Sequence, residues 1–155
     1  MELKNKTKIN GKIMAISISK EKGVSKENVL AVKVLEDFGI ENDAHAGTWH
    51  RQVSFLDLKT IEKMKNLIGR EVAFGELAEN ITTDADLSSV EVGDLISAGE
   101  CLSEVTQIGK KCHYGCAIFQ RVEQCEMRTH GVFTIVLRGG ILCVGDLLKI
   151  IKKKT

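Results

Sequence analysis

The chain has 155 residues and a mass of 17.1 kDa, which is the size of one ordinary domain with a hydrophobic core of its own. Its 22 basic and 21 acidic residues give a formal net charge of +1, so no overall field attracts nucleic acid or an anionic membrane. We therefore expect neither as a partner. The sequence has no proline, so its turns must depend on 14 glycines and on Asn and Asp.

Cysteine usage and the two ends of the chain indicate its compartment. The five cysteines are an odd number, and the first residues lack the apolar core of a signal peptide, which together predict a reducing, cytoplasmic location. No apolar run reaches the roughly 18 residues that a membrane helix needs. Lysines near both ends predict solvated basic tails at residues 1–10 and 152–155, around a single domain at residues 11–151.

The apolar pattern predicts a mainly β chain. Short runs rich in Ile and Val, bounded by glycine or polar residues, predict strands. These runs lie at residues 13–19, 29–35, 53–56, 102–108, 132–137 and 147–151. The pair Gly139-Gly140 separates two apolar runs and predicts a hairpin turn. Many short strands with few helices favour a closed or nearly closed barrel.

One segment has helical periodicity instead. Apolar residues recur every three to four positions from Leu58 to Ile68, Asp57 can cap the first amides, and Gly69 can end the helix. We predict a single amphipathic helix of about three turns there. A second, shorter helix is predicted at residues 117–126.

A five-residue pattern that occurs twice in the sequence predicts two similar turns. The run Val92-Gly93-Asp94-Leu95-Ile96 recurs as Val144-Gly145-Asp146-Leu147-Leu148. Glycine supplies a positive φ and aspartate can accept hydrogen bonds from neighbouring amides, so both runs predict a Gly-Asp turn that leads into a strand.

Two polar segments are candidates for ligand binding. Residues 42–51 place a carboxylate, two imidazoles and a guanidinium on a loop before a strand, and the fork of Arg51 suits phosphate or carboxylate oxygens. The alternative is a polar turn in which Asp43 bonds the backbone. Further along, Asn80 precedes two threonines, and its amide can bond a polar ligand or equally a backbone carbonyl.

The strongest chemical signal is Cys112. This thiol lies between lysines and the imidazole of His113, directly after a predicted strand, and such positive neighbours favour the thiolate. We therefore predict that Cys112 is a nucleophile or a ligand for a soft metal. Cys101 and Cys143 lie among apolar residues and are expected in the core.

A structural zinc site is the alternative use of the cysteines. Cys112, Cys116, Cys125 and His130 form the pattern C-x3-C-x8-C-x4-H, whose thiolates and imidazole could close a tetrahedral site. The pattern lacks the second closely spaced pair that is usual in such sites. Both interpretations of the thiols stay open at this point.

A family resemblance rests on motifs spread along the whole chain. They are Asp43-Ala44-His45-Ala46-Gly47, Arg51-Gln52-Val53-Ser54, Glu79-Asn80-Ile81, Val92-Gly93-Asp94, Cys112-His113, Gly131-Val132-Phe133, Gly139-Gly140 and Gly145-Asp146. In this order they resemble the MOSC domain, named for the C-terminal domain of molybdenum cofactor sulfurases, in its short stand-alone bacterial form. The resemblance runs from about Gly11 to Ile151. It implies a β-barrel like the small barrel domain of pyruvate kinase, with one or two short helices.

The resemblance also implies a function and a set of site residues. Cys112 matches the family's most characteristic cysteine, which is thought to carry sulfur towards the molybdenum cofactor (molybdopterin) or to ligate molybdenum itself. His113 would manage a proton. The residues expected to bind the anionic pterin cofactor are Asp43, His45, Arg51, Asn80 and Lys111.

The implied partners follow from what the chain lacks. It is too short to contain the pyridoxal-phosphate desulfurase domain of full-length sulfurases, so a separate cysteine desulfurase or other sulfur donor is expected, with a molybdoenzyme as acceptor. Two alternatives remain. One is a molybdenum-dependent reductase of N-hydroxylated substrates with an external electron donor, and the other is a non-catalytic zinc-stabilised interaction module.

Overall fold

The structure, a computed structural model, describes residues 8–22, 24–109 and 130–153, and these residues form eleven strands and one helix. The mainly β class predicted from the sequence is confirmed. The elements are β1 (Gly11–Ile18), β2 (Glu27–Val29), β3 (Ala31–Leu35), β4 (Gly39–Ile40), β5 (Val53–Asp57), α2 (Leu58–Ile68), β6 (Ile81–Thr83), β7 (Leu95–Ala98), β8 (Cys101–Ile108), β9 (Val132–Arg138), β10 (Gly140–Cys143) and β11 (Leu147–Ile151).

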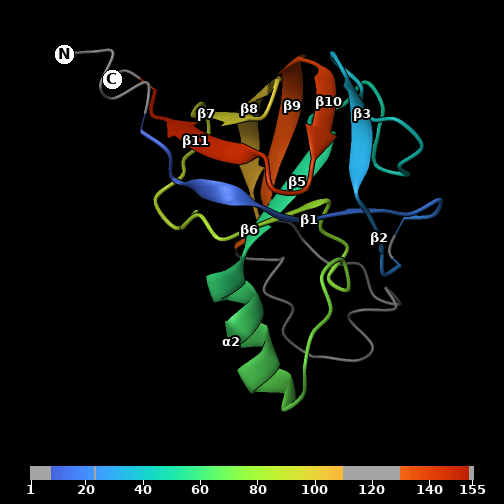
Figure 1. Ribbon diagram of the computed structural model, residues 1–155, viewed down its shortest axis with the longest axis vertical. Helices are drawn as coiled ribbons and strands as arrows, with labels where there is room; N and C mark the ends of the chain where they lie inside the picture. Colours follow the sequence, from blue (N-terminus) through green and yellow to red (C-terminus); the bar gives the residue numbers. More distant parts are fainter. Residues whose placement is uncertain (1–7, 23, 110–129, 154–155) are drawn as a thin grey trace.

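Seven of these strands close into a barrel, as the sequence predicted (Figure 1). The order is β11-β7-β8-β9-β5-β6-β1, and β1 returns to β11 through the pair Gly11 and Leu148. β2 extends the sheet beside the far end of β1, while β10, β3 and β4 form a second, three-stranded sheet. The pairing of β5 with β6 is parallel, because α2 and the chain after it carry the backbone across between them.

Apolar side chains fill two cores on the two sides of β5. Val53 and Phe55 belong to the core inside the barrel. Leu56 faces the other way and packs in a second core with Met64 of α2 and Phe133 of β9. Because both of its faces are covered, all five residues of β5 are buried, and the strand makes a rigid base for the loop that precedes it.

The helix begins and ends as its sequence predicted. The carboxylate of Asp57 accepts a hydrogen bond of 2.8 Å from the amide of Thr60. Gly69 adopts the left-handed conformation at φ 80°, and its amide donates to the carbonyl of Lys65 at 2.9 Å. No helix in the described ranges is long and apolar enough to cross a bilayer.

Two strand predictions were wrong in detail. The run predicted as one strand at residues 29–35 divides at Leu30, whose side chain is 83% exposed, so that β2 pairs with β1 and β3 pairs with β10. The glycines at 139 and 140 do not make a hairpin, because β10 pairs with β3 and β9 pairs with β8 and β5. A Cβ atom at Gly139 would overlap the carbonyl oxygen of Val34, so this glycine permits a close crossing onto β3.

The two repeated Gly-Asp motifs form the same type of turn, as predicted. Gly93 and Gly145 have φ values of 99° and 95°. In each turn the aspartate accepts a 2.8 Å hydrogen bond from the amide three residues earlier, Glu91 to Asp94 and Cys143 to Asp146. A repeat of five residues in the sequence thus corresponds to a repeat of backbone geometry.

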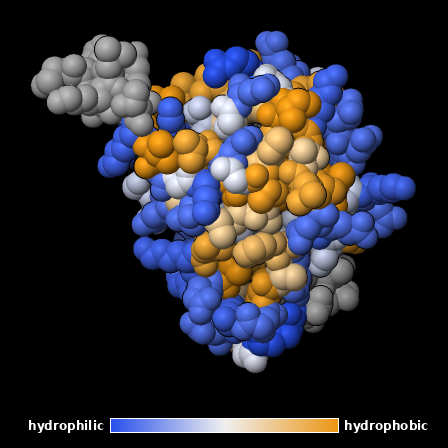
Figure 2. All heavy atoms as spheres, viewed as in Figure 1, coloured by the Kyte–Doolittle hydropathy of each residue, from blue (hydrophilic) through white to orange (hydrophobic). Residues whose placement is uncertain are grey.

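The outer surface carries an apolar area. Figure 2 shows apolar side chains gathered on the face where β1, β10 and β11 lie in Figure 1, with hydrophilic side chains around them.

Lys152 and Lys153 follow β11 and were expected to be solvated. Instead the ammonium of Lys152 lies 2.6 Å from a carboxylate oxygen of Asp94, and the amide of Lys153 donates to the other oxygen at 3.0 Å.

Candidate functional site

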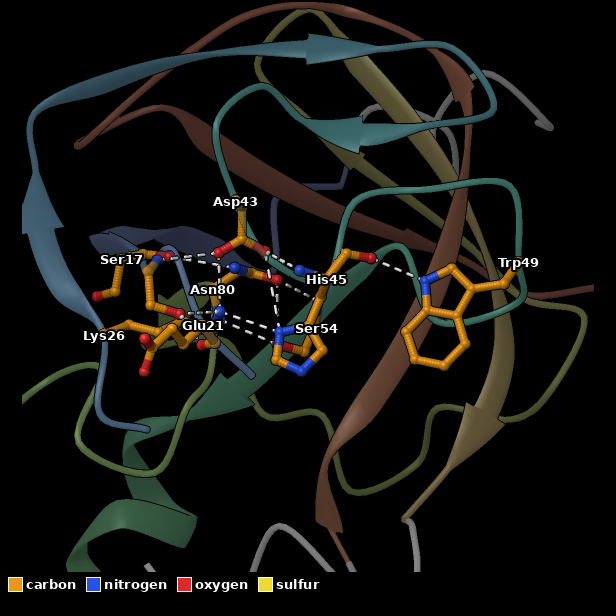
Figure 3. A network of polar contacts seen from close by, with 9 residues as sticks. Ser17, Glu21, Lys26, Asp43, His45, Trp49, Ser54 and Asn80 are labelled. Carbon is orange, nitrogen blue, oxygen red and sulfur yellow. Dashed lines mark hydrogen bonds and ion pairs between the residues drawn. The ribbon is translucent and has the colours of Figure 1, made fainter. Parts of the chain in front are cut away.

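Polar residues from four separate segments meet at one end of the barrel (Figure 3). Ile81 of β6 pairs with Ile16 near the end of β1 and with Phe55 of β5. This register brings together the end of β1, the loop before β5 and the residue before β6. The segment before β2 joins them because β2 pairs with the last residues of β1. We call this region the barrel mouth.

A buried ion pair with an adjoining histidine lies at the centre of the barrel mouth. The ammonium of Lys26 lies 2.7 Å from Oδ1 of Asp43, and both side chains are completely buried. The same nitrogen lies 3.0 Å from Nδ1 of His45 and 3.1 Å from Oγ of Ser19. Lys26 was missed in the sequence, where it follows other lysines in a polar stretch and carries no distinguishing signal.

Asp43 also shapes the loop that carries His45. Its Oδ1 accepts from the amide of Ser19 at 3.1 Å, and its Oδ2 accepts from the amide of His45 at 3.1 Å. The sequence offered a ligand-binding carboxylate or a turn-forming one. The structure places Asp43 in the turn-forming role, with the buried charge of Lys26 added to it.

A cluster of positive groups surrounds Trp49 beside this ion pair. Its indole nitrogen donates to the carbonyl of His45 at 2.7 Å, and the His45 and Trp49 rings are nearly parallel, with centroids 6.5 Å apart. The Arg51 guanidinium and the Lys22 ammonium each lie 4.6 Å from the Trp49 ring centroid, within cation–π range. Within the described residues, Nε of Arg51 is buried without a hydrogen-bond partner. The indole thus holds two cations at the barrel mouth.

Asn80 is a structural support of the barrel mouth. It is fully buried, and its side-chain oxygen accepts from the amide of Ser54 at 3.0 Å while its side-chain nitrogen donates to the carbonyl of Ser17 at 3.1 Å. The sequence left open whether this amide bonds a ligand or the backbone. Its bonds to the backbone of β5 and β1 tie the two strands together.

Glu79 belongs to the quoted Glu79-Asn80-Ile81 motif, but the sequence analysis gave this buried acid no role of its own. Burial raises the pKa of its carboxyl group, and the hydrogen bonds that oppose this shift, among them those from the amide of Gly75 at 2.9 Å and Oγ1 of Thr82 at 3.0 Å, do not offset it. Its other oxygen, Oε1, has no hydrogen-bond partner among the described residues. A raised pKa in a fully buried group favours the neutral acid.

The predicted reactive segment falls outside the described residues. This holds for Lys111, Cys112, His113, Cys116 and Cys125 and for the predicted helix at residues 117–126. In the described ranges, no three His, Cys, Asp or Glu side chains are close enough together to hold a metal ion. The sequence expectations for these residues therefore remain predictions.

The two cysteines in the described ranges differ in burial. Cys101 is buried, as predicted, and burial together with nearby carboxylates raises the pKa of its thiol to about 11. Such a thiol stays protonated and unreactive near neutral pH. Cys143 is only half-buried, so the expectation that it lies in the core was wrong.

The described surface is hollowed beside the barrel mouth and beside α2. One of about 640 Å³ adjoins the barrel mouth and is lined by Ile18, Ser19, Lys20, Glu21, Val24, Ser25, Glu27 and Asn42. A larger one of about 770 Å³ lies beside α2 at the far end of β5, where its lining includes Asp57, Lys63 and His130. Ser19 joins the first hollow to the buried ion pair, because its Oγ lies 3.1 Å from the ammonium of Lys26.

Comparison with known proteins agrees with the fold and identifies the family. The structure is similar to the YuaD protein of Bacillus subtilis, with a TM-score of 0.76 and 16% identity over 93% of this chain and 97% of that one. It is also similar to YiiM of Geobacillus stearothermophilus, with a TM-score of 0.70 and 20% identity over 92% and 75% of the two chains. YiiM of Escherichia coli gives 0.66 and 15% over 92% and 71%. No curated protein matches the sequence significantly. The model of the MOSC domain matches residues 42–149, so the chain belongs to the MOSC domain family.

Proposed function

We propose that the protein binds the molybdenum cofactor at the barrel mouth and that Cys112 carries sulfur to it or ligates its molybdenum. The family membership supports the cofactor class. The observation that carries the proposal further is the pair of cations, Arg51 and Lys22, held on the Trp49 ring at the barrel mouth.

The chemistry of these groups fits an anionic ligand. A guanidinium can donate two parallel hydrogen bonds to phosphate oxygens, and an ammonium adds a second positive charge. The buried Nε of Arg51 has no partner among the described residues and is a donor that a bound oxygen would satisfy. We therefore assign Arg51, Lys22 and His45 to the phosphate and pterin edge, with Lys111 as a further cation. Asn80 and Asp43 hold the strands and the loop that present these groups.

The thiol supplies the group-transfer step. In sulfur carriage the Cys112 thiolate attacks the outer sulfur of a donor persulfide, a new S–S bond forms, and the donor leaves as its thiolate. This loading step balances without an external oxidant or reductant. Release of the outer sulfur as sulfide would need a second thiol, which attacks the Cys112 sulfur and leaves a mixed disulfide. The bound cofactor would supply molybdenum, a soft acceptor for sulfur or thiolate. His113 lies next to this cysteine in the sequence and is proposed to hold the proton that the thiol loses.

Removal of single thiols tests the proposal. Wild type, Cys112→Ala and Cys143→Ala are each incubated with a persulfide donor and with molybdopterin, and persulfide and bound cofactor are measured by mass spectrometry. We expect Cys112→Ala to lose the persulfide label, while the control Cys143→Ala keeps it. If Cys112→Ala retains both label and cofactor, the central claim fails.

The same preparations separate the alternatives. Molybdenum retained by wild type but not by Cys112→Ala, with reduction of an N-hydroxylated substrate in a reductase-coupled assay, would replace sulfur carriage with reduction. One zinc per chain, with loss of the fold on chelation, would favour the zinc module instead. The proposed zinc ligands other than His130 lie outside the described residues.

A further inference from the structure

We propose that the hollow beside α2 binds a small organic anion with an apolar body, such as a medium-chain carboxylate. The hollow is separate from the barrel mouth, because it lies at the other end of β5, where α2 leaves the barrel (Figure 1). Its volume of about 770 Å³ is within the range of roughly 300–1,000 Å³ that is usual for small-molecule pockets. This inference does not depend on the proposed function.

Apolar side chains line the hollow on the side of the barrel. Among the described residues they come from the loop after β6 and from the paired ends of β8 and β9, and they are Leu87, Val90, Ile108 and Val132. Three of them are buried, but Ile108 remains 39% exposed. A ligand with an apolar body would cover Ile108, and removal of this surface from water favours binding.

Polar side chains line the hollow on the side of α2. They are Lys59, Thr60, Glu62, Lys63 and Asn66. Lys63 and Asn66 are three positions apart, so they share one face of the helix. In the part of the chain that the structure describes, neither side chain has a hydrogen-bond or ion-pair partner. They therefore offer an ammonium and an amide N–H to the carboxylate of a ligand.

The other charged side chains that β5 and α2 contribute to the lining already have partners. The two carboxylate oxygens of Asp57 accept hydrogen bonds from backbone amides at 2.8 and 2.9 Å. Glu62 lies 3.7 Å from the ammonium of Lys65, and the ammonium of Lys59 lies 3.5 Å from the carboxylate of Asp86. The unpartnered ammonium on α2 thus places an uncompensated positive charge beside an apolar surface. This combination selects an anion over a neutral or cationic ligand of the same shape.

Binding of simple amphiphiles to the full chain tests the proposal. Protein labelled with ¹⁵N is titrated with octanoate, 1-octanol, octylammonium and acetate, and the shifts of backbone amides give the affinity and the position of each ligand. We expect octanoate to shift amides of α2 and to bind about threefold more tightly than 1-octanol, because one accessible ion pair contributes about that much. Acetate has the charge without the apolar body and should not bind measurably there.

Two substitutions separate the charge from the apolar contact. Lys63→Met should lower the octanoate affinity to that of 1-octanol and leave 1-octanol binding unchanged. Ile108→Glu places a carboxylate on the apolar side and should weaken both ligands at least about tenfold. The partial exposure of Ile108 allows the fold to tolerate this change. Lys33→Met is the matched control, because it removes an exposed lysine of β3 that does not line the hollow, and it should change neither affinity.

Four results would overturn the proposal. The first is no octanoate shift at α2, and the second is an affinity for 1-octanol or octylammonium that equals the affinity for octanoate. The third is the same octanoate affinity in Lys63→Met and Lys33→Met. The fourth is a set of octanoate shifts at the barrel mouth that Arg51→Met removes, which would place the anion there and leave the proposed function standing. If Ile108→Glu does not fold, the ranking of the four ligands on wild type and Lys63→Met still decides.

Discussion

The molecule contains two lysine–aspartate pairs of almost the same length that have different roles. The nitrogen–oxygen distance is 2.7 Å between Lys26 and Asp43 at the barrel mouth and 2.6 Å between Lys152 and Asp94 at the end of β11. Both lysine side chains belong to polar stretches of the sequence. They differ in solvent exposure, which is 0% for Lys26 and 47% for Lys152.

The difference shows which pair depends on its lysine. Asp94 accepts hydrogen bonds from the amides of Glu91 and Lys153 as well as from Lys152. Burial alone would raise the pKa of Asp94, but these hydrogen bonds outweigh it and the pKa is lowered. Lys152 keeps water around half of its side chain. The side chain of Lys26 is fully shielded from solvent, so its ammonium depends on hydrogen bonds to Asp43, Ser19 and His45.

Removal of Lys26 is the largest expected perturbation. Lys26→Met leaves the buried carboxylate of Asp43 without its counter-charge, and we expect the free energy of unfolding to fall by about 3–5 kcal/mol. Urea denaturation at pH 7 measures the loss. The double variant with Asp43→Asn should recover part of it, because no buried charge then remains unpaired. A loss no greater than that of Lys152→Met would show that burial does not distinguish the two pairs.

The two Gly-Asp turns allow the contributions of their aspartates to stability to be compared. Asp94→Ala removes the acceptor for two amides and an ammonium, and we expect a loss of about 2–3 kcal/mol at pH 7. Asp146→Ala removes the acceptor for the amide of Cys143 at a half-buried position, so the loss should be about 1 kcal/mol. Thermal or urea unfolding of both variants gives the ranking. Equal losses would contradict the role assigned to the Lys152 and Lys153 contacts.

The lowered pKa of Asp94 gives this prediction a pH dependence. A carboxylate whose pKa is lower in the folded than in the unfolded state stabilises the fold above its unfolded pKa of about 3.9. That contribution is lost as the pH falls through the folded pKa. The difference in stability between wild type and Asp94→Ala should therefore shrink below about pH 4. A constant difference down to the acid limit would count against a charged Asp94.

The pKa of Glu79 is shifted in the opposite direction to that of Asp94, and we expect a smaller effect on stability. Its folded pKa is raised, so wild type binds more protons when folded and its stability falls as the pH rises from the unfolded pKa of about 4.3 towards the folded value. Glu79→Gln removes the ionisation but keeps an oxygen for the Gly75 amide. We expect it to be neutral or stabilising by about 1 kcal/mol at pH 7 and to remove this part of the pH dependence. Strong destabilisation by Glu79→Gln at pH 7 would show that the ionised form is needed.

Local chemistry explains how much of this structure the sequence predicted. The helix at residues 58–68 and the two Gly-Asp turns depend on neighbouring residues, so the sequence alone predicted them. The division of the 29–35 run and the crossing at Gly139 depend on which distant strand lies opposite, which no local pattern reveals. Lys26 differs from the surface lysines before it only in its tertiary surroundings.

The site residues, too, divide into those placed by neighbouring residues in the sequence and those placed by distant strands. Asp43, His45 and Arg51 share one loop with Trp49, and their proximity was predicted because the sequence itself puts them together. Asn80 carries an amide that suits a ligand or a backbone equally well. The choice between them follows from the strand register that places Ser54 and Ser17 on either side of it.

Lys152→Met is the smallest of the predicted effects and completes the comparison. The ammonium is half exposed and Asp94 keeps its two amide donors, so we expect the free energy of unfolding to change by less than about 1 kcal/mol. The change should become smaller in high salt, because the pair is accessible to screening ions, whereas the effect of Lys26→Met should persist. Urea denaturation at low and at high salt measures both. A large, salt-independent loss for Lys152→Met would mean that the pair of Lys152 and Asp94 acts like the buried pair at the barrel mouth. The nitrogen–oxygen distance would then predict the contribution of these two pairs to stability better than solvent exposure does.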